Sequence, residues 1–250
     1  MEKEYYKEYY RLETDHWVFS ARRKIALSML GRRYLARCAQ GASRPDILDA
    51  GTGTGVMLGE LGRFGNATGL DISKDAVEFC RKRGLTSVVK GSVGSLPFHD
   101  SSFDIICAMD ILEHLDDDGK ALEEFHRALR PEGILLVTVP AHMFMWGPHD
   151  EINMHKRRYT LGEVSVKVRR AGFKIERISY FNFFFFPAAA LIRVGRRIIF
   201  GDNLKPKSDL GAVPGPVNKV LEKIFSSERF LLKCCNLPFG VSVICVARRE

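Results

Sequence analysis

The chain has 250 residues, of which 46% are hydrophobic, and a formal net charge of +8 at pH 7. A chain of this length and composition can bury a full hydrophobic core, either in one large α/β domain, residues 1–250, which we expect, or in two smaller ones. The charged, aromatic start MEKEYYKEYY excludes a signal peptide, and no apolar run reaches the roughly 18 residues that a membrane-spanning helix needs. The six cysteines form no CxxC pair, which is typical of reduced thiols in a cytoplasmic protein.

The positive charge is concentrated in the C-terminal part of the chain. Residues 1–150 hold 19 Lys and Arg against 22 Asp and Glu, a net of −3. Residues 151–250 hold 19 against 8, a net of +11. This asymmetry favours an anionic partner, such as a phosphate-bearing substrate, a membrane surface or nucleic acid, although a solubilising surface explains it equally well.

Residues 1–44 are predicted to form two helices that act as a lid. Four tyrosines between residues 5 and 10 recur at helical spacing, and a second amphipathic helix spans about 22–38. Trp17 and Arg23 lie between or near these helices, where a ring can cover a ligand and a guanidinium can bind its carboxylate. A packed helix with a solvated face is the alternative.

A βαβ rhythm runs from about residue 45 to residue 180. Five strand-like segments end near residues 50, 71, 90, 110 and 140, and helical segments separate most of them. The fourth, FDIICAMD, is nearly all apolar, as a parallel strand buried on both faces should be. Two more strands, FKIERISYF and VSVICVARR, follow residue 170. The pattern predicts an open, mostly parallel sheet.

The first strand runs into a glycine-rich turn, ILDAGTGTG. Gly51, Gly53 and Gly55 allow positive φ and a close approach of the backbone to a ligand. GTGTG is shorter than the GxGxxG that binds a pyrophosphate, and Asp49 before it would repel phosphate. Asp71 ends the second strand, the place from which a carboxylate binds both ribose hydroxyls. The pattern indicates a nucleoside with an amino-acid-like group and no diphosphate.

The order and spacing of four motifs resemble those of the class I S-adenosylmethionine-dependent methyltransferases. The motifs are LDAGTGTG, GLDIS, GSVGSLPFHDSSFDIICAMDILEHL and LRPEGILLVTVP. The resemblance covers about Asp46 to Pro140. Within the family, the chain is similar to the small-molecule group of the ubiquinone and menaquinone type. It implies a Rossmann-like, doubly wound sheet of about seven strands, mostly parallel with an antiparallel last strand. N-terminal helices and a helical insert before the last strand would complete the fold. S-adenosyl-L-methionine is the implied cofactor.

The resemblance also assigns cofactor contacts. The glycine turn would line the methionine end, Asp71 would bind the ribose, and Asp110 would lie beside the sulfonium. Ser92 departs from the family, because many relatives have Asp or Glu there and a serine bonds the adenine amino group more weakly. With two residues of the predicted lid, the full cofactor set is Trp17, Arg23, Asp49, Gly51, Thr52, Gly53, Gly55, Asp71, Ile72, Ser92, Val93 and Asp110.

Residues 141–160 follow a strand end and break the pattern with His, aromatic and charged residues. This composition predicts a functional loop at the edge where open α/β sheets bind ligands. The candidate bases are His149 and His155, with Asp150 to orient one or share a proton. The predicted acceptor contacts are His142, Trp146, Arg157, Arg158 and Tyr159. A lid held by its own salt bridges is the alternative, and the irregular spacing predicts no metal site.

Residues 181–240 are predicted to form a helical cap inserted before the last strand, 241–250. The segment 183–200 joins four phenylalanines, an apolar stretch and several arginines. It suits a pocket for a greasy acceptor, or an interfacial segment at a membrane surface with basic flanks. The sequence therefore predicts a cytoplasmic enzyme that methylates a small or amphiphilic acceptor, lipid-like or anionic, with peripheral membrane contact as an open alternative.

Three rival functions are weaker. The basic C-terminal part suggests an RNA methyltransferase, but the chain shows no appended RNA-binding module, so a nucleic acid is not the expected substrate. A cofactor-binding scaffold without turnover is disfavoured by the intact glycine turn. A nicotinamide oxidoreductase is disfavoured because GTGTG stands in place of GxGxxG. No pattern in the chain specifies an oligomeric state.

Overall fold

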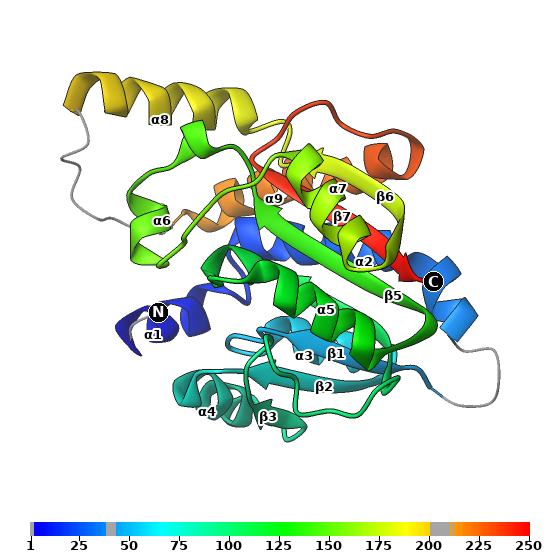
Figure 1. Cartoon of the computed structure of the whole chain (residues 1–250). Coiled ribbons are helices and arrows are strands. Elements are labelled where there is room, and N and C mark those ends of the chain that lie inside the picture. Colours follow the sequence, from blue (N-terminus) through cyan, green and yellow to red (C-terminus); the bar gives the residue numbers. More distant parts are fainter. Residues whose placement is uncertain (1–2, 39–43, 201–210, 212) are drawn as a thin grey trace.

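The computed structural model of the chain describes residues 3–38, 44–200, 211 and 213–250. In these residues the chain forms a seven-stranded sheet with helices packed on both faces (Figure 1). The strands are β1 (Asp46–Ala50), β2 (Asn66–Asp71), β3 (Val88–Lys90), β4 (Phe103–Met109), β5 (Leu129–Pro140), β6 (Phe173–Phe181) and β7 (Ser242–Arg249). The α-helices are α1 (Lys3–Leu12), α2 (Trp17–Cys38), α3 (Val56–Leu61), α4 (Lys74–Lys82), α5 (Asp118–Ala128), α6 (Pro148–Ile152), α7 (Leu161–Arg170), α8 (Phe186–Phe200) and α9 (Gly215–Cys234). Two short 3-10 helices are η1 (Leu112–His114) and η2 (Met143–Met145).

The strand order is β3-β2-β1-β4-β5-β7-β6. The first five strands pair in parallel, and β7 is antiparallel to both of its neighbours, β5 and β6. The predicted α/β, doubly wound sheet of about seven strands with an antiparallel last strand is therefore confirmed. The chain order reverses between β1 and β4, which opens a crevice at the carboxyl ends of these strands.

Alternate residues of the central strands face two separate hydrophobic clusters. Leu48 of β1 and Val137 of β5 pack in one cluster with residues of α5 and α7. Their neighbours Ile47 and Leu136 pack in the other with residues of α2 and α9. Burial of both sheet faces explains why the strands are almost continuously apolar in sequence.

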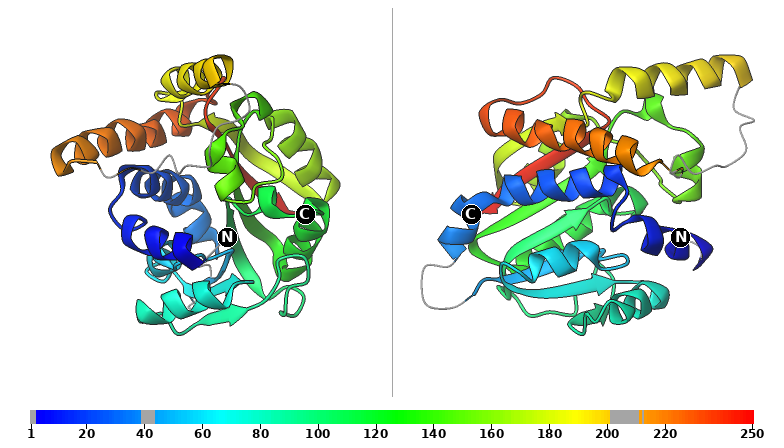
Figure 2. Two further views of the ribbon diagram at one scale, coloured as in Figure 1. Left: turned by 90° about the vertical axis from the view of Figure 1, so that its left-hand side faces the viewer. Right: turned by 180° about the vertical axis from the view of Figure 1, so that it is seen from behind.

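The N-terminal helix α2 and the inserted helix α9 lie side by side across one face of the sheet (Figure 2). The Asn218 side chain of α9 accepts a hydrogen bond from the Trp17 backbone N–H at 2.9 Å and donates to the Asp15 carbonyl at 2.8 Å. The other inserted helix, α8, lies at the outer edge, where Arg193 donates to a carbonyl of η2. Within the described part of the chain, no helix is long and apolar enough to cross a membrane.

The structure differs from the prediction where β5 begins. The stretch LDDDGKALEEFHRALRPEG predicts a helix that Pro131 and Gly133 stop, but α5 ends at Ala128 and Leu129 already belongs to β5. Pro131 disfavours helical backbone at Arg130, the residue before it, and Leu129 pairs with Phe103 of β4. The Pro- and Gly-rich composition of residues 205–216 predicts a connector, and most of this segment lies outside the described residues.

Candidate functional site

A cavity of about 290 Å³, here called the first cavity, lies where β1, β2 and β4 end. Residues of α1, α2 and η1 close its other sides. Nine of its lining residues were predicted cofactor contacts or neighbours of them in the glycine turn: Arg23, Asp49, Gly51, Thr52, Gly53, Thr54, Asp71, Ile72 and Asp110. The structure thus brings together residues that are up to 87 positions apart in the sequence, from Arg23 to Asp110.

The glycine turn has the backbone that its sequence predicts. Gly51, Gly53 and Gly55 have φ values of 78°, 56° and 89°. A Cβ at Gly51 would lie 2.9 Å from the Ile111 side chain, whereas a Cβ at Gly53 would meet nothing within 4 Å. The first glycine is therefore required by packing, and the second leaves open space in which a ligand can approach the backbone.

Two buried carboxylates fix the turn. Asp49 accepts a hydrogen bond from the Thr52 hydroxyl at 2.7 Å, and Asp71 accepts one from the Gly53 N–H at 3.0 Å. Burial raises the pKa of Asp49 to about 7, although the Thr52 hydrogen bond lowers it, and burial also raises the pKa of Asp71. A cationic ligand in this cavity would favour the ionised carboxylates, so the lining suits an ammonium or a sulfonium.

The N-terminal segment covers the first cavity, as a lid would. Tyr6, Tyr9 and Glu13 line it, and the Thr54 hydroxyl of the glycine turn donates to the Glu13 carboxylate. Arg83, just after α4, donates to the carbonyls of Tyr10 and Thr54, both at 2.8 Å, and its guanidinium lies 4.2 Å from the centre of the Tyr10 ring. Arg83 therefore fastens α1 to the glycine turn.

Replacing Arg83 with methionine is expected to weaken cofactor binding by about tenfold, because two carbonyls lose a charged donor and the lid opens more often. Calorimetric titration with S-adenosylhomocysteine measures the affinity, and limited proteolysis of α1 measures the opening. Arg81, exposed on α4, gives the control Arg81→Met. Equal affinities in the two variants would refute the fastening role of Arg83.

The remaining predicted cofactor residues lie away from the first cavity. Trp17 packs against Phe185 with ring centroids 4.9 Å apart and lines a different cavity. Gly55 caps the start of α3, and Ser92 accepts a hydrogen bond from the Gly94 N–H at 3.2 Å. Val93 is buried in the hydrophobic cluster that contains Leu48 and Val137. None of these four residues is among those that line the first cavity.

A second cavity of about 310 Å³ adjoins the first. The two share five lining residues: Tyr9, Phe19, Arg22, Asp110 and His114. Arg22 donates to the Asp110 carboxylate at 2.5 Å and to the Ser242 hydroxyl at 2.9 Å. Asp110 has a positive φ of 51°, which is unusual for a residue other than glycine. The same residue makes the ion pair with Arg22. This ion pair stands at the junction of the two cavities.

The loop 141–160 contributes three of its predicted residues to the second cavity: His149, His155 and Arg158. Asp150 is fully buried behind them and accepts hydrogen bonds from His155 Nδ1 and Arg158 Nε, both at 2.8 Å. Burial alone would raise the pKa of Asp150, but these partners hold it well below its usual range. Asp150 is therefore an ionised anchor that orients the histidine and the arginine.

Four of the five predicted acceptor contacts do not line the second cavity. The Tyr159 hydroxyl donates to Asp118 at 2.7 Å inside the core, and Arg157 donates to the Asp116 carbonyl at 3.0 Å. His142 stacks on Tyr180 with centroids 4.9 Å apart, and Trp146 donates to Glu151. These four side chains are committed to contacts that hold the loop in place, three of them with elements outside the loop.

Sequence reasoning missed Glu13, Arg83 and Glu113, whose functional positions depend on tertiary contacts. Glu113 lies in η1, shortly after β4 and near Asp110, and it lines the second cavity. Its neighbour His114 lines both cavities. The only available signal was the polar pair Glu113 and His114 after an apolar strand.

Comparisons with known proteins agree with this geometry. Residues 48–137 match the family model described as a methyltransferase domain. The chain is 30% identical over 146 residues to a probable S-adenosylmethionine-dependent methyltransferase of Mycolicibacterium smegmatis, covering 56% of each chain. It is 31% identical over 104 residues to the demethylmenaquinone methyltransferase of Chlorobaculum tepidum, covering 40% of this chain and 43% of that protein. The chain thus spans about half the length of the curated relatives it matches.

A solved structure of an S-adenosylmethionine-dependent methyltransferase from Archaeoglobus fulgidus shares the fold, with a TM-score of 0.60 and 20% identity over 98% of this chain and 99% of that one. The fold, the glycine turn and the match of residues 48–137 to a methyltransferase domain together support a class I S-adenosylmethionine-dependent methyltransferase. The family's cofactor, S-adenosyl-L-methionine, fits the first cavity because open space lies before Gly53 and the lining is acidic.

Proposed function

We propose that the protein transfers a methyl group from S-adenosylmethionine in the first cavity to a small or amphiphilic acceptor in the second. The observation that carries this proposal is the shared wall of the two cavities, formed by Tyr9, Phe19, Arg22, Asp110 and His114. When bound, the cofactor supplies an electrophilic methyl group on a sulfonium, which reacts by in-line displacement. The chain supplies the alignment of the two ligands, from which much of the rate can come.

The residues at the junction perform separate tasks in this proposal. Tyr9 and Phe19 pack edge to face, with centroids 5.3 Å apart, and exclude water between the cavities. Arg22 is held by Asp110 and Ser242, so its charge is fixed beside the reacting groups. His155 receives the acceptor in the second cavity with a ring oriented by Asp150. A proton must leave an alcohol or phenol acceptor, and His155 is the group placed to assist that step.

We infer an amphiphilic acceptor from the aromatic and basic surroundings of the second cavity. Trp17 is among its lining residues and packs against Phe185, while the guanidinium groups of Arg22, Arg158 and Arg193, paired with Asp110 and Asp150, are basic groups in its wall. A ring with hydroxyl groups and an apolar tail would match both features. The demethylmenaquinone methyltransferase among the relatives supports an acceptor of the prenylated quinol type.

Formation of S-adenosylhomocysteine in the presence of different acceptors tests the proposal. We expect turnover with reduced quinols or phenols that carry an apolar tail, and mass spectrometry should find one added CH₂ per methylated product. RNA of mixed sequence serves as the comparison acceptor and should give none. Tight cofactor binding without turnover on any small or amphiphilic acceptor would refute the proposal and favour a non-catalytic scaffold.

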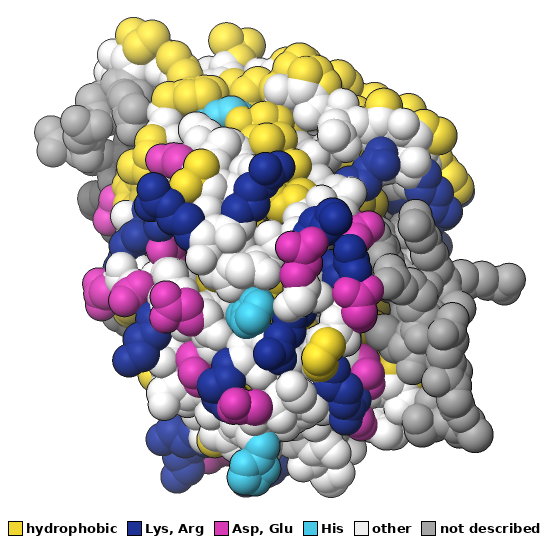
Figure 3. Space-filling model, turned by 45° about the vertical axis from the view of Figure 1, so that its right-hand side comes forward, with side chains coloured by type: hydrophobic (Ala, Val, Ile, Leu, Met, Phe, Trp, Pro, Cys, Tyr) yellow, Lys and Arg dark blue, Asp and Glu magenta, His cyan; other side chains and the backbone are white. Residues whose placement is uncertain are grey.

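We further propose that α8 contacts a membrane surface from which such an acceptor is drawn. Leu191, Ile198 and Ile199 are 76%, 79% and 73% exposed, and Arg196 on the same helix is exposed too. Hydrophobic side chains gather along the upper edge of the molecule in Figure 3, the edge at which α8 lies in Figure 1. Apolar residues with basic neighbours are typical of helices that lie in the membrane interface.

The double variant Leu191→Glu, Ile198→Glu is expected to reduce binding to vesicles of mixed neutral and anionic lipid by about tenfold or more, because two exposed apolar contacts become charged. Co-sedimentation at low salt measures the bound fraction. Val166→Glu on α7, where the side chain is 49% exposed, is the matched control and should bind normally. Absence of wild-type binding to these vesicles would exclude the membrane contact.

A further inference from the structure

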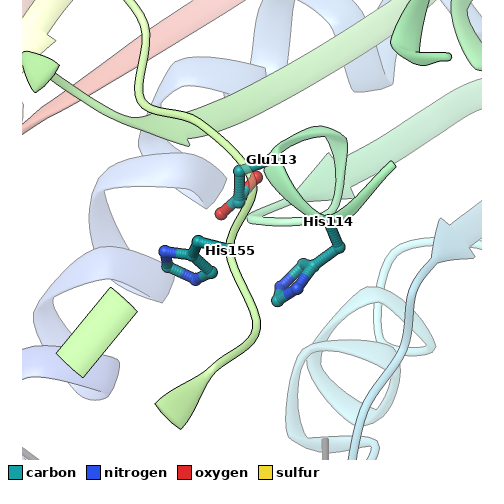
Figure 4. Close-up of side chains that lie close together, drawn as sticks. All are labelled: Glu113, His114 and His155. Atoms are coloured by element: carbon teal, nitrogen blue, oxygen red, sulfur yellow. The ribbon is translucent and has the colours of Figure 1, made fainter. Parts of the chain in front are cut away.

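Three side chains with metal-binding groups converge on the wall of the second cavity (Figure 4). Glu113 and His114 come from η1, and His155 comes from the segment that follows α6. One ligand atom of each lies within 4.8 Å of the other two. The two imidazole rings meet edge to face with centroids 4.8 Å apart. The sequence analysis predicted no metal site because the spacing within the loop 141–160 is irregular, and it did not connect His155 with Glu113 and His114.

Glu113 requires a partner that the described residues do not provide. Its side chain is fully buried, and neither carboxylate oxygen has a hydrogen-bond partner among the residues that the structure describes. The nearby guanidinium groups are committed elsewhere, Arg22 to Asp110 and Arg158 to Asp150. A buried carboxyl without a partner is costly whether it is ionised or protonated, so a cation in front of it would remove the penalty.

His155 is oriented as a ligand. Its Nδ1 lies 2.8 Å from a carboxylate oxygen of Asp150, which the Arg158 guanidinium also binds. A carboxylate can only accept a hydrogen bond, so Nδ1 carries a proton, and in the neutral ring Nε2 is then the nitrogen with the lone pair that a metal ion needs. A carboxylate behind a histidine, fixing its tautomer in this way, is the usual second partner of metal-binding histidines.

We propose that Glu113, His114 and His155 bind one divalent first-row transition-metal ion. Two imidazoles and one carboxylate favour zinc, iron(II), cobalt or manganese over magnesium and calcium, which prefer oxygen ligands. Metal–ligand bonds of about 2.1 Å require the donor atoms to close on the ion by roughly 1 Å. Three protein ligands leave coordination positions open toward the second cavity.

The role of the ion rests on the proposed function. An acceptor hydroxyl bound to the metal loses its proton to water more readily, because the positive charge stabilises the oxyanion. The oxygen then forms a bond to the methyl carbon while the carbon–sulfur bond breaks and its electron pair stays on sulfur. The inferred acceptor is therefore an oxygen nucleophile, such as a phenol with a neighbouring oxygen, and His155 acts through the metal.

Metal binding is tested without any acceptor. Untagged protein, stripped with a chelator, is titrated with Co²⁺ while the visible absorption of the bound ion is followed, and Zn²⁺ is added as a competitor. We expect one ion per chain. Glu113→Gln, His114→Ala and His155→Ala should each lower the affinity for Co²⁺ by about 100-fold or more. Loss of a residue that only hydrogen-bonds to a metal ligand costs about 10–100-fold. The exposed His99 gives the control His99→Ala, with wild-type affinity.

Folding is checked separately from binding. Thermal unfolding should show that metal raises the melting temperature of the wild type and of His99→Ala but not of the three ligand variants. Retained binding of S-adenosylhomocysteine by those variants shows that they are folded. Wild-type protein that binds no ion with defined stoichiometry, or ligand variants that bind as the wild type does, would overturn the inference.

The two proposals can fail independently. Stoichiometric metal binding with no methyl transfer to any acceptor would leave the metal site standing and refute the proposed function. Methyl transfer that persists unchanged in stripped protein would refute the role of the ion in the reaction and leave the function standing, whereas wild-type protein that binds no ion would refute the metal site itself. Methyl transfer that is lost on stripping and restored by Zn²⁺, Co²⁺ or Mn²⁺ would support both.

Discussion

Replacing His155 with alanine is expected to lower the rate of methyl transfer by about 10²–10⁴-fold at saturating acceptor. The ring lines only the second cavity, where Asp150 fixes its orientation, so it contacts the acceptor side of the reaction. The affinity for S-adenosylmethionine should stay within about twofold, because no residue of the first cavity changes. Single-turnover kinetics and calorimetric titration measure the two quantities on the same preparation.

The surface variant His99→Ala controls for the loss of a histidine and should match the wild type. The pH dependence of the rate distinguishes the chemical role of His155 from a structural one, because a structural loss lowers the rate equally at every pH. If His155→Ala turns over at the wild-type rate, neither the acceptor position nor the metal-ligand role can be correct.

The affinity for S-adenosylmethionine is expected to rise with pH as Asp49 ionises. Burial raises the pKa of Asp49 to about 7 in the free protein, where nearby Glu13 and Asp71 raise it and Thr52 lowers it. A ligand that carries an ammonium and a sulfonium favours the ionised carboxylate, so it binds more tightly once the proton has left. Below pH 7 we expect the affinity to fall by up to about tenfold for each pH unit.

The stability of the free protein should change in the opposite direction. The folded-state pKa of Asp49 lies above its ordinary value of 3.8, so the folded state holds the proton more tightly than the unfolded state. This contribution is fully present below that ordinary value and is lost as pH rises toward 7. Denaturant titrations across this range should show the loss in the wild type and less of it in Asp49→Asn.

Asp49→Asn is also expected to bind the cofactor more weakly at pH 8 and with a flatter pH dependence. Glu123→Gln, an exposed change on α5, serves as the control for the loss of one carboxylate. A wild-type affinity that is independent of pH between 5 and 8 would contradict the assignment of Asp49 to the cationic end of the cofactor.

The parts of the site that could be predicted from the sequence are those fixed by local chain geometry. The glycine turn between β1 and α3 carries its conformational requirement in its own residues, and the φ values of Gly51, Gly53 and Gly55 match it. Asp71 was predictable because the end of β2 always meets the end of β1 in this sheet. For the glycine turn and for Asp71, the position at the end of a strand was enough to predict a place in the site.

The acceptor side could not be predicted in the same way, because its residues have partners from distant elements. Arg157 and Tyr159 were expected to face a substrate. Instead, Arg157 donates to the carbonyl of Asp116, which precedes α5, and Tyr159 donates to the carboxylate of Asp118 in α5. Glu113 gave no signal of its own, since its burial without a partner depends on where two arginines are held. A loop rich in polar residues does not reveal which of them stabilise it.

A structure of the protein with S-adenosylhomocysteine bound would test the central claim most directly. We expect the ribose hydroxyls on Asp71, the amino group beside Asp49 and the sulfur at the junction next to Asp110, facing the second cavity. Binding of this ligand outside the first cavity, or with its sulfur directed away from the second, would contradict the proposed transfer between the two cavities.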